Sequence, residues 1–265
     1  MLGFMTTLAS RTIAALRAEH DTLASTVPAL SIAQLTGPSG AAEWTVADVL
    51  SHMGSGAEIS LAGYRGSIGE AAPPEPSFNQ SVWDRWNAMD PADQAARSLE
   101  GNAELVETLA ALTPEQHNAI KVKIGFLPEP LTLTSYAGMR LNEVAHHGWD
   151  VRVATDPAAT LADDSAQALA EHFAGGLGFL FGFIGKAAPA DSAVIAIGQT
   201  PFAIVLDEGA RWSADASGVT ATFTGGLESA VRLIAGRLTP PHTPAGVTVT
   251  GNISLDDLRR VFPGY

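Results

Sequence analysis

The first part of the chain is dominated by apolar positions that recur three and four residues apart, the spacing of one helix face. In the first such segment, Leu8, Ile13, Leu16 and Leu23 lie roughly on one side. Proline, glycine and polar residues separate the segments, so each helix is expected to end in a loop. The expected helices are residues 6–26, 46–67, 77–88 and 90–112, and a further helix that begins near Thr132. We predict an up-and-down bundle of four main helices with one long crossover.

The pattern changes from about residue 156. Residues 162–185, where glycines alternate with phenylalanines, predict a helix packed against a sheet. Short apolar or alternating runs then predict strands. The strands are expected at residues 192–198, 201–206, 211–214, 219–224 and 247–250, and helices at residues 227–237 and 254–261. Helices segregated from a mainly antiparallel sheet form an α+β domain. We therefore predict a helical bundle over residues 1–155 and a smaller α+β domain over residues 156–265.

Composition narrows the class of partner. The 265 residues carry a net charge of −13, which argues against nucleic acids and anionic membranes, because both attract clustered Lys and Arg. A hydrophobic content of 46% favours a well-packed globular protein. No apolar run reaches membrane-spanning length, and residues 1–5 lack the basic flank of a signal peptide, so we expect a cytoplasmic protein. The absence of cysteine means that any thiol chemistry must take its sulfur from a small molecule.

The helix that begins near Thr132 carries a polar face. At about 100° per residue, Arg140, Glu143, His147 and Asp150 fall within an arc of roughly 80°. A glutamate followed four residues later by a histidine puts an oxygen and a nitrogen ligand one turn apart, within reach of one metal ion. The alternative is a face that forms salt bridges to another helix.

A second histidine stands in the helix expected at residues 46–67. Thr45 and Asp48 predict a capping box at its start, and Trp44 and Val49 are spaced for a hydrophobic staple across it. His52 follows two turns in, on the apolar side. Such a histidine can be a packed core residue. Combined with the glutamate and histidine of the later helix, it predicts a facial His-Glu-His metal site with open positions.

These two segments together resemble the mycothiol-dependent maleylpyruvate isomerase family, within the wider DinB-like metalloproteins. The resemblance rests on residues 44–52 (WTVADVLSH) and on the set Arg140, Glu143, His147 and Asp150. Residues 235–237 (AGR) and 247–252 (VTVTGN) are similar to that family's small second domain, so the resemblance covers nearly the whole chain. It implies a DinB-like four-helix bundle in which His52, Glu143 and His147 bind a divalent metal, usually zinc.

The resemblance also implies chemistry. Mycothiol would be the thiol co-substrate, and a small electrophile of the maleylpyruvate type would be isomerised or would accept the sulfur. Such chemistry needs a cation for a substrate carboxylate or enolate. Arg237 is similar to the family's second-domain arginine; the alternative is a surface arginine that ends a helix.

Asp150 can orient a ligand or a nearby base, or can be a helix-end acid paired with Arg152 or Arg140. Two other classes of function stay open on the same bundle. One is a non-catalytic protein that binds a metal or a small ligand. The other is a hydrolase that activates water at the metal.

Overall fold

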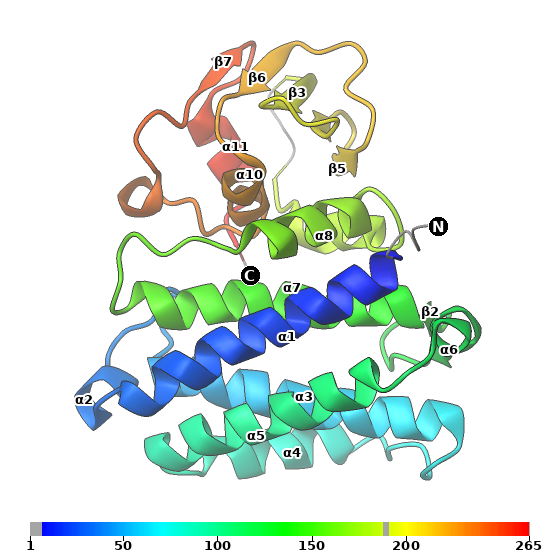
Figure 1. Ribbon diagram of the computed structural model, residues 1–265. Helices are drawn as coiled ribbons and strands as arrows, with labels where there is room; N and C mark the ends of the chain where they lie inside the picture. Colours follow the sequence, from blue (N-terminus) through cyan, green and yellow to red (C-terminus); the bar gives the residue numbers. More distant parts are fainter. Residues whose placement is uncertain (1–6, 188–190, 265) are drawn as a thin grey trace, which may run out of the picture. The chain divides into compact units, whose positions relative to one another are not determined.

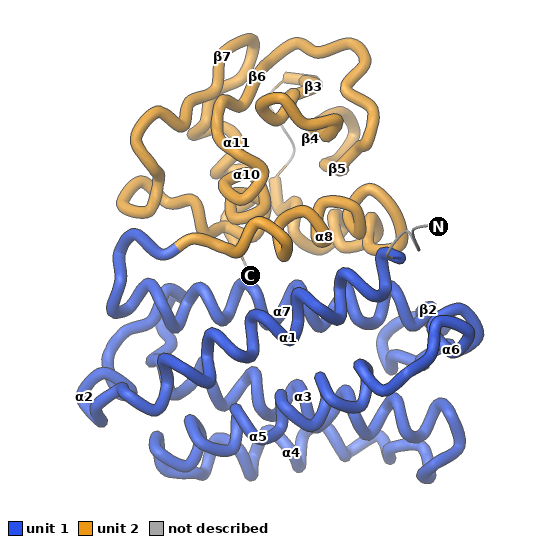
Figure 2. The backbone as a smooth tube through the Cα atoms, in the orientation of Figure 1, with its two compact units in different colours: residues 1–159 blue, residues 160–265 orange. Residues whose placement is uncertain are grey.

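The computed structural model describes residues 7–187 and 191–264 (Figure 1). The predicted start of the first helix at Thr6 lies outside the described residues, and so do residues 1–5, for which no signal peptide is expected. The chain divides into two compact units, Met1–Ala159 and Thr160–Tyr265 (Figure 2). This division falls a few residues after the predicted boundary at 155/156. That each unit is a separate functional domain stays a prediction.

Unit 1 is a helical bundle. Its long helices are α1 (Leu8–Thr26), α3 (Val46–Ile68), α4 (Phe78–Asn87), α5 (Pro91–Ala110) and α7 (Leu133–Val153). α3 packs on α5 and α1 packs on α7, while α1 also meets α5 and α3 also meets α7, which closes a four-helix arrangement (Figure 1). α4 lies against the outer side of α3. The predicted bundle is confirmed.

Short elements connect these helices. They are η1 (Val27–Ala29), α2 (Ile32–Leu35), α6 (Pro114–Ala119) and the antiparallel strands β1 (Lys121–Val122) and β2 (Leu131–Thr132). The sequence patterns did not predict α2, which is a single turn closed by a capping box between Ser31 and Gln34. An element of four residues is too short to show helical periodicity.

The start of α3 is set by side chains. Thr45 Oγ1 accepts a hydrogen bond from the Asp48 amide at 3.1 Å, and Asp48 Oδ2 accepts one from the Thr45 amide at 2.9 Å. The predicted capping box is therefore present, and two amide groups that the helix leaves without partners are satisfied. The helix ends at Ile68, and its C-cap Gly69 has a φ of +80°, which suits glycine.

Glycines let α3 approach its neighbours. A Cβ on Gly54 would lie 2.2 Å from the Trp86 indole and 3.0 Å from Ser98 Cα, so only glycine fits between α3, α4 and α5. A Cβ on Gly56 would lie 2.9 Å from Arg140 Nη1 of α7. Gly63 on the same helix has no atom nearer than 3.9 Å to such a Cβ. Close packing therefore explains Gly54; at Gly56 a methyl group would displace the Arg140 guanidinium, and at Gly63 there is room for one.

Unit 2 combines a sheet with helices. Its described helices are α8 (Asp163–Phe173), η2 (Gly178–Leu180), α9 (Phe181–Ile184), α10 (Leu227–Ile234), η3 (Pro240–His242) and α11 (Leu255–Val261). Its strands are β3 (Ala193–Ile197), β4 (Ala203–Leu206), β5 (Ala210–Ser213), β6 (Ala221–Phe223) and β7 (Val249–Gly251). The described strands form one five-stranded sheet in the order β5-β4-β3-β6-β7. Only the β3–β6 pairing within it is parallel, so the predicted α+β class with a mainly antiparallel sheet is confirmed.

One predicted helix is wrong in extent. Residues 162–185 do not form a single helix: α8 ends at Phe173, and a turn separates it from η2 and α9. Each glycine in a helix costs about 1 kcal/mol relative to alanine, and residues 175, 176, 178 and 182 are all glycine. The break also lets Phe181 meet Phe173 edge-on, at 5.7 Å between ring centroids. No helix in residues 7–187 or 191–264 is long and apolar enough to cross a membrane.

Candidate metal centre

Three potential ligands meet between α3 and α7. His52 Nε2 lies 3.0 Å from Glu143 Oε2, and His147 Nε2 lies 3.7 Å from the same oxygen. One ligand atom from each of the three residues lies within 4.8 Å of the other two. His52 and Glu143 are 91 residues apart in the chain, so the packing of α3 on α7 brings them together. The structure thus assembles the predicted His-Glu-His set.

The spacing suits a metal ion. Zinc bonds of about 2.1 Å in tetrahedral geometry separate two ligand atoms by roughly 3.4 Å, and the separations of 3.0 and 3.7 Å from Glu143 lie on either side of that value. Two imidazoles and one carboxylate leave positions open, as catalytic zinc sites do. The side chains of His52 and Glu143 are 37% and 31% exposed, so small molecules have access, whereas that of His147 is 6% exposed.

Asp150 lies behind His147. Its Oδ2 is 2.9 Å from His147 Nδ1, and its side chain is fully buried. The loop of residues 37–45 packs closely here, because the Gly40 amide donates to the Asp150 carbonyl at 2.8 Å and a Cβ on Gly40 would lie 2.9 Å from Asp150 Oδ1. Arg152, one alternative partner for this carboxylate, has its Nη1 3.1 Å from Glu19 Oε2.

Arg140 lies one turn before Glu143 and is 6% exposed. Its Nη2 donates to the Asn102 amide oxygen of α5 at 3.3 Å. Burial lowers the pKa of its guanidinium, and the nearby Glu143 carboxylate opposes that effect. Arg140 therefore contributes a buried positive charge beside the site.

Glu143 is held in its charged form. Burial alone would raise the pKa of its carboxyl group, but the hydrogen bond with His52 and the neighbouring His147 and Arg140 outweigh burial and lower that pKa well below its usual range. An ionised carboxylate is the form that binds a metal ion.

Trp44 also lies at this site, and the sequence patterns did not predict that position. Its indole lies 5.9 Å from the His147 ring, nearly parallel at 22°, and 5.2 Å from the His52 ring. We predicted Trp44 as a staple partner of Val49; Val49 is fully buried, whereas Trp44 is 38% exposed. One signal was available: Trp44 directly precedes the N-cap of the helix that carries His52.

Arg237 belongs to unit 2 and follows Gly236, whose φ is +74°. It is 6% exposed, and its Nη1 donates to the Ala235 carbonyl at 2.9 Å. The alternative of a surface arginine at a helix end is therefore wrong. Its predicted role toward a substrate anion stays a prediction.

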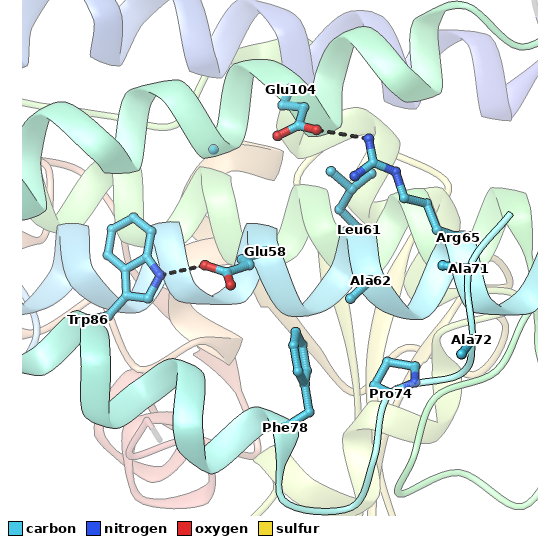
Figure 3. A pocket seen from close by; sticks show the side chains of 11 residues that line it. Glu58, Leu61, Ala62, Arg65, Ala71, Ala72, Pro74, Phe78, Trp86 and Glu104 are labelled. Carbon is cyan, nitrogen blue, oxygen red and sulfur yellow. Dashed lines mark hydrogen bonds and ion pairs between the residues drawn. The ribbon is translucent and has the colours of Figure 1, made fainter.

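A separate cavity of about 500 Å³ lies between α3, α4 and α5 (Figure 3). Its polar side chains pair with one another or with neighbours: Arg65 with Glu104 at 2.9 Å, and Glu58 with the Trp86 indole at 2.9 Å. Leu61, on its wall, points about 180° away from His52 around α3. The cavity is therefore not the metal site.

Comparison with known proteins gives a family match for the helical unit. The model of the family described as mycothiol maleylpyruvate isomerase N-terminal domain matches residues 16–152, a span that contains all three potential ligands. No curated protein matches the chain.

Two solved structures share the fold. They are crystal structures of the mycothiol-dependent maleylpyruvate isomerase and of a histidine-to-alanine mutant of it. Their sequences are 16% and 17% identical to this chain. Each match covers 94% of this chain and 98% of the other, with a TM-score of 0.63. At this identity, the likeness establishes the arrangement of the backbone.

Proposed function

The chain belongs to the mycothiol maleylpyruvate isomerase family, and from that membership we propose that it is a metal-dependent enzyme that uses mycothiol as a thiol co-substrate. Its reaction is an isomerisation or an S-transfer on a small electrophile of the maleylpyruvate type. The observation that carries this proposal is the convergence of His52, Glu143 and His147 from two helices.

The donor set favours zinc among divalent metals, because imidazole and carboxylate together suit it. When bound there, such an ion supplies positive charge that lowers the pKa of a thiol and keeps its sulfur nucleophilic near neutral pH. The chain has no cysteine, so a bound small molecule has to bring the sulfur.

The surrounding residues would hold the site in its working form. The Asp150 carboxylate can only accept a hydrogen bond, so it keeps the proton of His147 on Nδ1 and leaves Nε2 facing Glu143. Glu143 acts as a ligand and is not available as a general base. We assign Arg237 the role of holding a substrate carboxylate or enolate, as the family resemblance implies.

One experiment separates this proposal from the two other classes of function. The purified chain would be analysed for bound metal and then incubated with mycothiol and maleylpyruvate, following product and free thiol by chromatography. The proposed enzyme needs both metal and thiol for turnover. A binding protein turns nothing over. A hydrolase is indifferent to the thiol, and that result, or turnover by the metal-free chain, would refute the proposal.

A further inference from the structure

Trp44 is positioned by a loop with an unusual backbone. Among the described residues, Glu43 is the only non-glycine residue with positive φ, at +65°. Residues other than glycine adopt this conformation at a cost, and such positions gather at functional sites. Glu43 directly precedes Trp44, so the strain lies where the chain turns the indole toward α3.

Further contacts hold the loop of residues 37–45 in place. Ser39 donates to the Trp44 carbonyl from its amide at 3.0 Å and from its hydroxyl at 2.8 Å. Pro38 and Thr45 form an isolated β-bridge across the base of the loop. The contact of Gly40 with Asp150 ties the loop to α7, the helix that carries Glu143 and His147. Trp44 is therefore anchored to both helices that supply the potential ligands.

The indole meets both imidazoles and still has an exposed surface. It lies within 6 Å of the His52 and His147 rings, which are 4.7 Å apart. Trp44 is 38% exposed, so its indole is not used for core packing alone. The side chains of His52 and Glu143 are also partly exposed. The exposed part of the indole therefore lies beside the two imidazoles that would hold the ion.

We propose that Trp44 forms an aromatic wall of the ligand position at the metal centre and contacts the sulfur-bearing co-substrate there. Sulfur next to an aromatic ring, about 5 Å from its centre, is a favourable contact, whereas a water molecule gains little from an apolar wall. Trp44 is then a binding residue that favours a thiol over water. This inference rests on the proposed function and adds a residue to it.

The test uses the full-length chain loaded with cobalt(II), which accepts the same types of ligand as zinc. Mycothiol is titrated into the loaded protein, and the sulfur-to-cobalt charge-transfer absorption gives its dissociation constant. The variants are Trp44→Ala, Trp44→Phe and Trp44→Leu. Trp83→Phe is the matched control, because Trp83 is 41% exposed on α4 and lies outside the metal centre.

We expect Trp44→Ala to keep its affinity for cobalt within about threefold and to bind mycothiol about tenfold more weakly, the upper range for a lost sulfur–aromatic contact. Trp44→Phe should recover most of the thiol affinity, and Trp44→Leu, which keeps an apolar side chain but no ring, should bind mycothiol as weakly as Trp44→Ala and replaces it if the alanine variant does not fold. The control should match the wild type. Cobalt should also quench tryptophan fluorescence in the wild type and the control, and much less in Trp44→Phe.

Two results would overturn the inference while leaving the proposed function intact. One is an unchanged dissociation constant for mycothiol in Trp44→Ala. The other is a loss of cobalt binding in all three Trp44 variants, which would make the indole a support for the histidines only. If the wild-type protein took up no cobalt, or showed no charge-transfer band with mycothiol, the proposed function itself would fail and the inference with it.

Discussion

His147 Nδ1 lies 2.9 Å from Oδ2 of Asp150, a carboxylate without solvent exposure. The two residues are three positions apart on α7, so the helix itself sets their separation. Residues that orient metal-binding histidines in this way contribute strongly to metal affinity.

Replacing Asp150 with asparagine should weaken metal binding by about tenfold to a hundredfold. The amide removes the charge and can present an N–H to Nδ1, which favours the tautomer that has a proton on Nε2. Competition with a chromogenic chelator would measure the affinity. Asp164→Asn, at an exposed position in α8, is the control and should behave as the wild type. Equal metal affinities in the two variants would mean that Asp150 does not strengthen metal binding through His147.

His52→Ala should reduce the bound metal from about one ion per chain to nearly none after gel filtration, because two ligands remain. Elemental analysis would measure this, and circular dichroism would check the fold. His20→Ala on α1 is a histidine control that should keep its metal. Full metal content in His52→Ala, or a lower melting temperature without metal loss, would show that His52 is not a ligand.

Two glycines of α3 should respond to alanine in opposite directions. Gly54→Ala places a methyl group 2.2 Å from the Trp86 indole and should destabilise the protein by about 1–3 kcal/mol. Gly63→Ala meets no atom within 3.9 Å and should stabilise it by up to about 1 kcal/mol through helix propensity. Urea unfolding of both variants would test the pair. A neutral Gly54→Ala would contradict the tight packing of α3 on α4 and α5.

Residues 1–159 expressed alone should fold and bind about one divalent metal ion, because all three potential ligands belong to that unit. Elemental analysis would measure the bound metal, and circular dichroism would show whether the fragment is folded. A folded fragment that binds no metal would mean that residues 160–265 supply a further ligand.

Arg237→Met should lower turnover by about a hundredfold while metal content stays unchanged, the scale for one lost charge stabiliser. Since Arg237 is buried, the melting temperature has to be measured beside the rate. Arg260→Met, on the exposed side of α11, controls for the loss of one positive charge. Full turnover in a folded Arg237→Met would show that this guanidinium does not stabilise charge during the reaction.

Much of the fold follows from local signals. The capping box between Thr45 and Asp48 and the alternation along the strands act over a few residues, so the sequence reveals them directly. The approach of Glu143 to His147 is equally local, because one helical turn separates them. The sequence links His52 to this pair only through the type of its donor atom, since no periodicity relates residues 91 positions apart.

What could not be predicted depends on contacts between elements. The stacking of Trp44 on His147 requires the loop of residues 37–45 to dock on α7, which no pattern within either segment encodes. Similarly, the hydrogen bond of Arg140 with Asn102 depends on how α5 packs on the bundle. The break after Phe173 is consistent with the glycines that follow it, each of which weakens a helix, although the whole of residues 162–185 was expected to be one helix.

The capping box of α3 has a consequence beyond stability. Because it fixes the first turn of α3 beside the loop that contacts α7, it helps to hold the register in which His52 faces Glu143. If α3 slipped by one residue in its packing against α7, His52 would turn by about 100° around the helix axis, away from Glu143. Damage to the Thr45–Asp48 pair would therefore misdirect an intact histidine, and a substitution seven residues from a ligand could cost metal without removing any donor atom.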